Sequence, residues 1–388
     1  MSEGAPPDTD AQVADDVATA ETLPARTFTE RRWLERELGS VFARSWQLVP
    51  ERAADDDPRP LAEQLAARGA RVPVTLGGRP LYLQRGWDDD QLRLFPNTCT
   101  HAWYPLVLGP SRGPTLVCGQ HGRRFDCAGR FVSQPGFQGA PAFPRDCDHL
   151  RAMPAAVWRQ LVLAALDPAA PPLADVLAPI DASLVHFPDT LIRVASGGEV
   201  RDVAGNWKQH AWNFLDPFHI AFVHRAPGGL ADAVDLATYT TELFEHAVLQ
   251  WVYARDPADG FDPAMLPERF ADRQGRGRRV FALWWFLYPN LALNFYPWGL
   301  SVNVYQPLPD RPDMTRFGWY HWVLDPTRHA ERDRRWLSAQ VDAEDVDALA
   351  QVSRGLRSGF APRGRFAPGD EQAAHWLHRK VSRDVLAT

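Results

Sequence analysis

Two short motifs in the first third of the chain each pair one cysteine with one histidine: Cys99-Thr-His101 and Cys118-Gly-Gln-His121. A [2Fe–2S] centre that is held by two cysteines on one iron and two histidines on the other needs this set of ligands. Four such residues can also form a tetrahedral zinc site, but structural zinc loops more often have two cysteines separated by two residues. The spacing therefore favours an iron–sulfur cluster, and a structural zinc site is the alternative.

A second group of chemistry-bearing side chains lies in the segment NWKQHAWNFLDPFHIAFVH, which contains Asn213, Asp216, His219 and His224. Asp216 and His219 are three residues apart and would be neighbours on a helix. His219 and His224 are five apart and would diverge on a regular helix, so binding one metal requires a helix end or a wider turn between them. Two histidines and a distant carboxylate form the facial triad of a non-haem Fe(II) oxygenase.

Another histidine pair, His375 and His378, lies at helical spacing after Glu371. The charged residues around this pair indicate a solvated helix rather than a metal site. The pair at His219 and His224 is the stronger candidate because it occurs together with the cluster motif upstream.

Taken together, the two constellations resemble the catalytic α subunit of the Rieske non-haem iron oxygenases. The similarity includes the runs FARSWQLVP, HGRRFDCAGRF and YPNLALNFYP and a helix that ends in RGL, so it spans about residues 28–385. The resemblance implies that Cys99 and Cys118 bind one iron of a Rieske [2Fe–2S] cluster. It implies that His101 and His121 bind the other iron.

The resemblance makes His219 and His224 ligands of a mononuclear Fe(II), with a carboxylate from the segment DAEDVDALAQVSRGL as the third ligand. On a regular helix Asp342 and Asp345 share a face, whereas Asp347 points away from Asp345. Alignment of the RGL sequence with the family pattern selects Asp345, and Asp342 and Asp347 are the alternatives.

Two residues of the segment that contains His219 and His224 are catalytic candidates. By the resemblance, Asp216 falls where the family keeps a carboxylate that is hydrogen-bonded between a cluster histidine and an iron histidine. Such a group fixes histidine tautomers and couples the two centres. Asn213, in the same segment, is the second candidate.

The sequence departs from the family pattern beside the cluster motifs. Ala102 and Trp103 follow the first motif where the family usually has Arg-Gly, Gln120 replaces an aromatic residue, and Arg123 replaces a tryptophan. These departures concern loop packing and the reduction potential, not the number of ligands.

Changes in composition along the chain predict the elements that position these residues. Residues 1–24 are acidic and small and contain no aromatic residue, which predicts a disordered tail. Apolar residues at helical spacing follow, and then short strands broken by Gly and Pro, which predict an iron–sulfur domain with an N-terminal helix at 25–170. After a proline-rich linker at 168–179, strands followed by helices predict a catalytic domain at 171–388. The fold class is α+β: an all-β Rieske domain and, by the resemblance, a helix-grip antiparallel-sheet catalytic domain.

Composition excludes several function classes. The chain has 388 residues and a formal net charge of −6, so it lacks the basic field of a nucleic-acid-binding protein. Four cysteines are too few for a disulfide framework, and we see no secretory signal. The most apolar stretch, residues 281–300, contains prolines and asparagines that argue against a membrane helix. We therefore expect a cytoplasmic protein without membrane or nucleic-acid partners.

The function that the resemblance implies is that of a terminal oxygenase. It would use O₂ and electrons from a separate NAD(P)H-dependent reductase or ferredoxin to hydroxylate or oxidatively demethylate a small molecule. The family's head-to-tail electron transfer between subunits implies a homotrimer. The alternative is a Rieske electron-transfer protein without oxygenase activity.

The sequence leaves the substrate open, together with the choice between monooxygenation, dioxygenation, demethylation and desaturation. The strands resemble family members that act on quaternary amines. Tryptophans could build a cage for such a cation, although tryptophans more often belong to the core. The candidates are Trp284, Trp285, Trp298, Trp319 and Trp322.

Overall fold

The computed structural model describes residues 8–51, 59–194, 199–327, 329–330 and 338–387. The chain divides into two compact units. One unit is residues 42–171, and the other combines residues 1–41 with 172–388. The sequence predicts the N-terminal helix within the iron–sulfur domain, whereas residues up to Val41 belong to the second unit.

The unit of residues 42–171 contains a seven-stranded antiparallel sheet in the order β1-β10-β9-β4-β3-β2-β5, a three-stranded sheet β6-β7-β8, and a short helix, α3. The runs VPVTL, PLYLQ and LRLFP form strands as predicted, because alternate apolar side chains pack in one core. The bounds are β1 Gln47–Leu48, α3 Leu61–Gln64, β2 Ala70–Leu76, β3 Arg79–Arg85, β4 Leu92–Pro96, β5 Ser111–Arg112, β6 Thr115–Val117, β7 Arg124–Asp126, β8 Phe131–Ser133, β9 Met153–Trp158 and β10 Leu161–Ala164.

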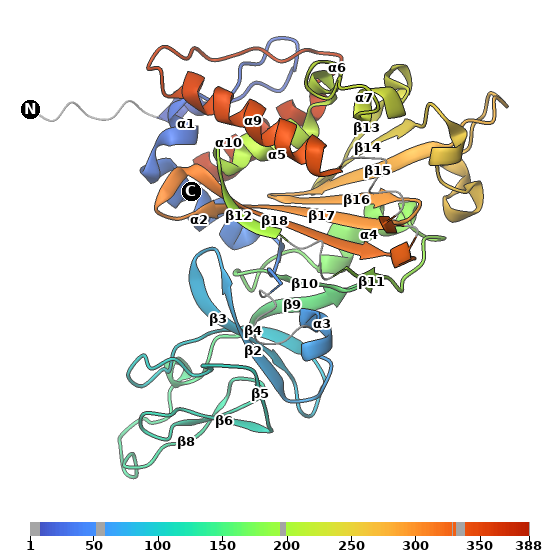
Figure 1. The fold of residues 1–388 in the computed structure, drawn as a ribbon. Coiled ribbons are helices and arrows are strands. Elements are labelled where there is room, and N and C mark those ends of the chain that lie inside the picture. Colours follow the sequence, from blue (N-terminus) through green and yellow to red (C-terminus); the bar gives the residue numbers. More distant parts are fainter. Residues whose placement is uncertain (1–7, 52–58, 195–198, 328, 331–337, 388) are drawn as a thin grey trace, which may run out of the picture. The chain divides into compact units, whose positions relative to one another are not determined.

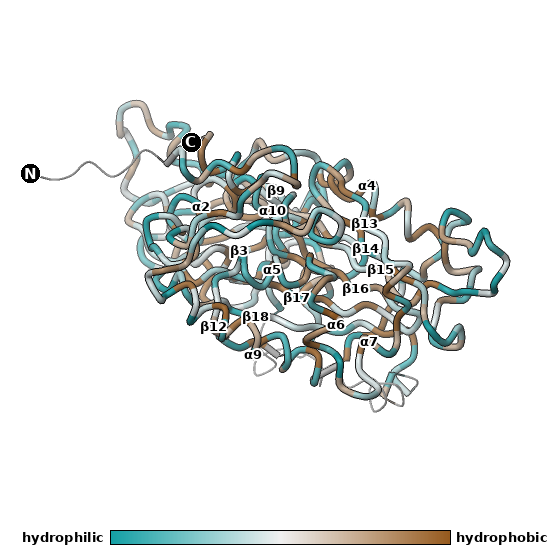
Figure 2. The backbone as a smooth tube through the Cα atoms, turned by 90° about the horizontal axis from the view of Figure 1, so that it is seen from above, coloured by the Kyte–Doolittle hydropathy of each residue, from teal (hydrophilic) through white to brown (hydrophobic). Residues whose placement is uncertain are grey.

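The other unit is built on an antiparallel sheet in the order β11-β18-β17-β16-β15-β14-β13, with β12 also paired to β18. The inner strand β15 is buried along its whole length, and Figure 2 shows the hydrophobic stretches of β14–β17 running side by side. The strand bounds are β11 Ile192–Arg193, β12 Glu199–Ala204, β13 Thr240–Leu243, β14 Ala247–Tyr253, β15 Val280–Leu287, β16 Leu291–Tyr296, β17 Gly299–Leu308 and β18 Arg311–Val323.

Helices α5, α9 and α10 gather on one face of this sheet (Figure 1). The predicted α+β architecture is therefore confirmed. The helix bounds are α1 Arg26–Thr29, α2 Arg31–Arg44, α4 Leu173–Ser183, α5 Trp207–Leu215, α6 Ile220–Val223, α7 Leu230–Ala233, α9 Ser338–Leu356 and α10 Gln372–Leu386.

The predicted linker at 168–179 is wrong in its second half. Helix α4 begins at Leu173 and continues through Pro179, because it buries Val176, Leu177 and Ile180 in one stripe. In the described part of the chain, no helix is both long and apolar enough to cross a membrane.

The predicted disordered tail is also wrong for residues 8–24, while residues 1–7 lie outside the described part of the chain. Ala11, Ala20 and Leu23 are fully or almost fully buried. His378 on α10 accepts a hydrogen bond from the Leu23 N–H at 3.0 Å, and the ring of His375 bonds the Ala14 carbonyl at 2.8 Å. The pair on α10 is thus buried rather than solvated, and it anchors the N-terminal segment.

Candidate active site and cluster site

A cavity of about 230 Å³ lies in the second unit, between the sheet and the helices α5, α6 and α9. Strand register aligns the residues that form the sheet side of the cavity. Trp284 pairs with Asn294, Asn294 with Ser301, and Asn303 with Trp319 on neighbouring strands. These residues therefore share one face of the sheet, which the cavity exposes. The helices supply the opposite wall, which carries the predicted metal-binding residues.

A break between two helices brings His219 and His224 together. Helix α5 starts with a capping box at Asn206 and ends before Asp216, whose side chain accepts a hydrogen bond from the Phe218 N–H. A 3₁₀ turn, η4 (Pro217–His219), and the single-turn helix α6 follow. The two histidines lie at opposite ends of α6, with 3.2 Å between their Nε2 atoms. This is the wider turn that the spacing required.

Asp345 on α9 completes the group. Its Oδ1 atom lies 3.1 Å from Nε2 of His224 and 3.5 Å from Nε2 of His219. The three ligand atoms are all within 4.8 Å of one another. Of the two alternatives, Asp342 forms an ion pair with Arg201 and Asp347 is exposed. The structure thus brings the predicted carboxylate, and not the alternatives, to the histidine pair.

The hydrogen-bond pattern shows that this group fits a metal cation. Nδ1 of His219 faces the Asp216 carbonyl, which can only accept, and Nδ1 of His224 lies 2.8 Å from a Glu344 carboxylate oxygen. Both Nδ1 atoms therefore carry the proton, and both Nε2 lone pairs point at Asp345. Oδ1 of Asp345 is buried and has no hydrogen-bond donor among the described residues. Three converging lone pairs repel one another unless a cation lies between them.

The electrostatics agree with this arrangement. Burial raises the pKa of Asp345, but the close contacts and charge of the two histidine rings outweigh burial, so its pKa lies below the ordinary value and the group is ionised. Burial lowers the pKa of His224, yet the carboxylates of Asp345 and Glu344 raise it overall. The site therefore favours positive charge.

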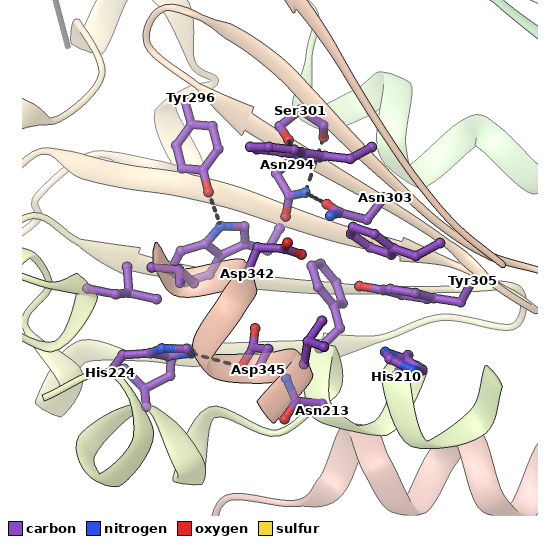
Figure 3. Close-up of a pocket in the computed structure, with 18 of the residues that line it drawn as sticks. His210, Asn213, His224, Asn294, Tyr296, Ser301, Asn303, Tyr305, Asp342 and Asp345 are labelled. Carbon is purple, nitrogen blue, oxygen red and sulfur yellow. Dashed lines mark hydrogen bonds and ion pairs between the residues drawn. The ribbon is translucent and has the colours of Figure 1, made fainter. Parts of the chain in front are cut away.

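The predicted catalytic candidates both line the cavity. The Asp216 carboxylate lies 3.8 Å from Nδ1 of His219, and desolvation raises its pKa. Asn213 lies on the last turn of α5 and faces the cavity near Asp345 (Figure 3).

The four predicted cluster ligands lie on two loops of the unit 42–171. The thiols of Cys99 and Cys118 are buried and adjacent, and burial together with Cys118 raises the pKa of Cys99. The ring of His101 is half-buried and that of His121 is exposed, and their centroids lie 4.8 Å apart. Two buried thiols and two adjacent imidazoles fit a cluster with cysteines on the inner iron and histidines on the outer one.

Arg123, which stands where the family usually has tryptophan, is buried and ties these loops together. Its guanidinium donates to Gln134, to Thr100 at 2.8 Å and to Asp148 at 3.1 Å. Gln134 in turn contacts the His101 ring at 3.0 Å. A charged hydrogen-bond network thus occupies the tryptophan position.

Sequence reasoning did not assign roles to several residues of the cavity. Glu344 holds His224, and the buried His210 stacks on Tyr305 with its pKa lowered by burial to about 4. The Asn294–Asn303 pair was also missed. Only the acidic run around Asp345 offered a sequence signal, for Glu344, because the other contacts depend on strand register.

Two family models match the chain. The ring hydroxylating alpha subunit (catalytic domain) model matches residues 192–387, and the Rieske [2Fe-2S] domain model matches residues 60–144. The match to the catalytic-domain model excludes a protein that has only a cluster domain, and the match to the Rieske model excludes a structural zinc protein.

Curated relatives match along most of the chain. Chloroplastic choline monooxygenase of Arabidopsis thaliana is 27% identical over 383 residues, which cover 93% of this chain and 83% of the relative. The carnitine monooxygenase oxygenase subunit of Escherichia coli (strain K12) is 24% identical over 351 residues, which cover 89% of this chain and 87% of the relative.

Solved structures share the fold. A quaternary ammonium Rieske monooxygenase has a TM-score of 0.73 at 19% identity and covers 97% of this chain and 98% of its own. A naphthalene 1,2-dioxygenase variant bound to phenanthrene has a TM-score of 0.67 at 18% identity, covering 96% and 94%.

The protein is accordingly the terminal component of an oxygenase system, with a Rieske [2Fe–2S] cluster and a mononuclear iron as cofactors. It uses O₂ and electrons from a separate reductase or ferredoxin to hydroxylate or oxidatively demethylate a small organic substrate. The alternative of an electron-transfer protein is wrong, since the catalytic domain is present. The chain belongs to the ring-hydroxylating α-subunit family, the Rieske non-haem iron oxygenases.

Proposed function

We propose that this oxygenase acts on a small organic ammonium compound and hydroxylates a carbon next to the nitrogen. The observation that carries the proposal is the aromatic wall of the cavity. Trp284 stacks on Tyr239 at 5.8 Å and donates a hydrogen bond to the Tyr296 hydroxyl at 3.2 Å. Tyr296 stacks in turn on Trp298 at 4.6 Å. Faces of this kind attract an ammonium group through cation–π interaction.

The predicted tryptophan cage needs a correction. Trp284, Trp298 and Trp319 line the cavity, but Trp285 and Trp322 do not. Trp285 follows Trp284 on a strand, so its side chain points to the opposite face, where it donates to Ser183 at 3.0 Å. Tyr239, Tyr296 and Tyr305 also line the cavity.

Charge supports the same substrate class. Asp216, Asp342 and Asp345 line the cavity, and among the described lining residues none is Lys or Arg. The named relatives include choline and carnitine monooxygenases, both of which act on quaternary ammonium compounds.

In the reaction that we propose, His219, His224 and Asp345 bind the iron, which supplies the O₂ chemistry. Cys99, His101, Cys118 and His121 bind the cluster in the other unit. One oxygen atom enters a C–H bond of the substrate, and the other leaves as water with two electrons and two protons. If the carbon is an N-methyl group, the C–N bond of the product then breaks, releasing formaldehyde and a proton, and the nitrogen keeps the electron pair.

We also propose that the electrons come from NAD(P)H through the reductase and that Asp216 couples the cluster of one subunit to the iron of its neighbour in a homotrimer. Exposed apolar side chains support such a contact. Phe218 and Phe222 beside His219 are 51% and 64% exposed, and Trp103 beside the first cluster motif is 82% exposed.

A substrate screen tests the proposal. The purified protein, a surrogate reductase and NADH would be incubated with a panel of ammonium compounds, aromatic acids and aromatic hydrocarbons. Mass spectrometry should show the gain of one oxygen or the loss of one methylene for ammonium compounds, and an Asp345→Ala variant is the control without turnover. Turnover of the aromatic compounds alone would disprove the proposed substrate class.

A further inference from the structure

Arg123 is a buried cation beside the proposed cluster ligands. It follows His121 by two residues along the chain, and only 1% of it is exposed. Phe131, Phe137 and Phe143 surround its guanidinium, with ring centroids 5.4, 5.6 and 5.5 Å from the central carbon. Arginine keeps its proton in proteins, so this positive charge is permanent. A charge in apolar surroundings acts on its neighbours more strongly than a charge in water.

The hydrogen bonds of Arg123 reach both loops that carry the proposed ligands. The guanidinium donates at 2.8 Å to the hydroxyl of Thr100, which lies between Cys99 and His101. It also donates to the side-chain oxygen of Gln134. Because Arg123 itself lies next to the second motif, one side chain connects the two motifs.

These contacts fix the orientation of the Gln134 carboxamide. Arginine only donates, so the group that faces Arg123 must be the Gln134 oxygen. The NH₂ group of Gln134 then faces Nδ1 of His101 at 3.0 Å. A donor at this point keeps the lone pair on Nδ1 and the ring proton on Nε2. Through Gln134, Arg123 therefore sets which nitrogen of His101 is available to iron.

The carboxylate of Asp148 offsets only part of the charge of Arg123. Its Oδ1 atom accepts from Arg123 at 3.1 Å, while its Oδ2 atom accepts from the Arg145 backbone N–H at 2.8 Å. The Arg145 guanidinium lies 3.7 Å from the same Oδ2 atom, so two cations share one buried carboxylate. The group of this network that contacts His101 is the amide donor of Gln134.

We propose, resting on the cluster ligands proposed above, that Arg123 is a positioning residue that raises the reduction potential of the cluster. The reductase gives up one electron and the cluster gains it, so the reduced cluster carries one more negative charge. A permanent cation and an oriented amide donor stabilise this form more than the oxidised form. The tryptophan that the family usually has at this position supplies no charge. The cluster of this chain therefore accepts electrons more readily than it would with tryptophan at position 123.

Reduction potentials of the purified holoenzymes test the proposal. Titration with dithionite and mediator dyes, followed by the visible and electron paramagnetic resonance spectra, gives the midpoint potential. For Arg123→Gln we expect the equilibrium constant for reduction to fall about tenfold, which is about 59 mV for a one-electron couple. Arg123→Lys keeps the charge and should keep most of the potential. The matched control is Arg124→Gln, because water screens the exposed charge of Arg124, and this change should alter the constant by about twofold or less.

Two further variants separate the effect of charge from an effect on folding. Gln134→Leu removes the donor at His101 and should lower the potential. Asp148→Asn removes the negative partner of Arg123 and should raise it. A merely structural role of the network would reduce the amount of cluster in both variants without moving the potential in opposite directions. Gln138→Leu, at an exposed glutamine of the same loop, is the control and should leave the potential unchanged.

The outcomes are distinct. Equal potentials in the wild type, Arg123→Gln and Arg123→Lys would overturn the proposal, and so would a lower potential in Asp148→Asn. If Arg123→Gln assembles no cluster, the opposite shifts expected for Gln134→Leu and Asp148→Asn decide. The ligand assignment fails separately, because a wrong assignment would leave the Rieske spectrum of a His101→Cys variant unchanged, whatever the potentials of the Arg123 variants.

Discussion

Asp345 and Asp342 lie one turn apart on α9 but have different partners. Asp345 lies within 3.5 Å of both histidine Nε2 atoms, and Asp342 pairs with Arg201. We expect Asp345→Ala to abolish mononuclear iron and activity, because only two ligands remain, while the coloured cluster stays. Asp342→Ala should keep its iron. Iron analysis and the visible spectrum measure both, and the reverse pattern would make Asp342 the ligand.

The Asp216 carboxylate lies beside His219 and does not closely approach His224 or Asp345. Asp216→Asn should retain both metal centres and bind substrate, yet lose most of its turnover, because the path for electrons into the iron is interrupted. Single-turnover kinetics with a chemically reduced cluster would locate the defect. Loss of iron from this variant would show that Asp216 acts as a ligand instead.

The cluster-binding cysteines and histidines could be predicted from the sequence, because the residues of each motif are close together in the chain. Cysteines and histidines two or three residues apart must lie close in any fold. Glu344 and the Asn294–Asn303 pair could not be predicted, since their contacts depend on how α9 docks and on the register between β16 and β17.

At the scale of elements, a buried ion pair fixes helix α2 to helix α5. Glu37 and Lys208 are both fully buried with 2.6 Å between Oε1 and Nζ, and the Trp207 indole donates to the other Glu37 oxygen at 2.8 Å. Burial raises the pKa of Glu37 and lowers that of Lys208.

Removing one partner leaves an unpaired charge in the core. Lys208→Met should therefore lower the free energy of unfolding by about 3–5 kcal/mol. The exposed pair of Arg31 and Glu35 is the control, and Glu35→Gln should cost at most about 1 kcal/mol. Denaturant unfolding measures both variants, and equal effects would contradict the prediction.

The anchoring of the N-terminal segment on α10 should depend on pH. Burial, with further contributions from the charges of Lys208, His375 and Arg363, lowers the pKa of His378 to about 3 from the ordinary 6.5. Its neutral ring accepts the Leu23 N–H. Because the unfolded chain takes up this proton first, the contribution to stability is complete above about pH 6.5 and is lost as the pH falls toward about 3.

His378→Gln keeps an acceptor but cannot titrate in this range. We expect the variant to show a smaller fall in Tm between about pH 7 and about pH 5 than the wild type, and slower cleavage of residues 8–24 by protease at the lower pH. An identical pH dependence in both proteins would rule out His378 as the cause. Local composition could not reveal this anchoring, because its partners lie more than 300 residues away.

At the scale of the whole molecule, the two centres lie in separate units, and the proposed trimer can be tested by mixing defective subunits. Cys118→Ser should lack a complete cluster but keep the iron, and Asp345→Ala should keep the cluster but lack the iron. Each alone should be inactive.

Co-expressed, the two variants should recover activity, because in the proposed trimer the cluster of one subunit serves the iron of its neighbour. Cys127→Ser, a change at a buried cysteine whose thiol bonds the Gly113 carbonyl, is the control that should keep its own activity. No recovery in mixed assemblies would mean that electrons pass within one subunit. Light scattering on the same samples gives the number of subunits.

The position of the iron residues along the chain has a consequence for biosynthesis. The four cluster ligands fall between residues 99 and 121, so that site is complete early in translation. His219 and His224 lie on one short turn, but Asp345 lies on α9, which is followed along the chain only by helix α10. With the ligands proposed above, the cluster site is complete in a nascent chain long before the iron site, and iron binding by all three residues requires that α9 has been synthesised and packed on the sheet.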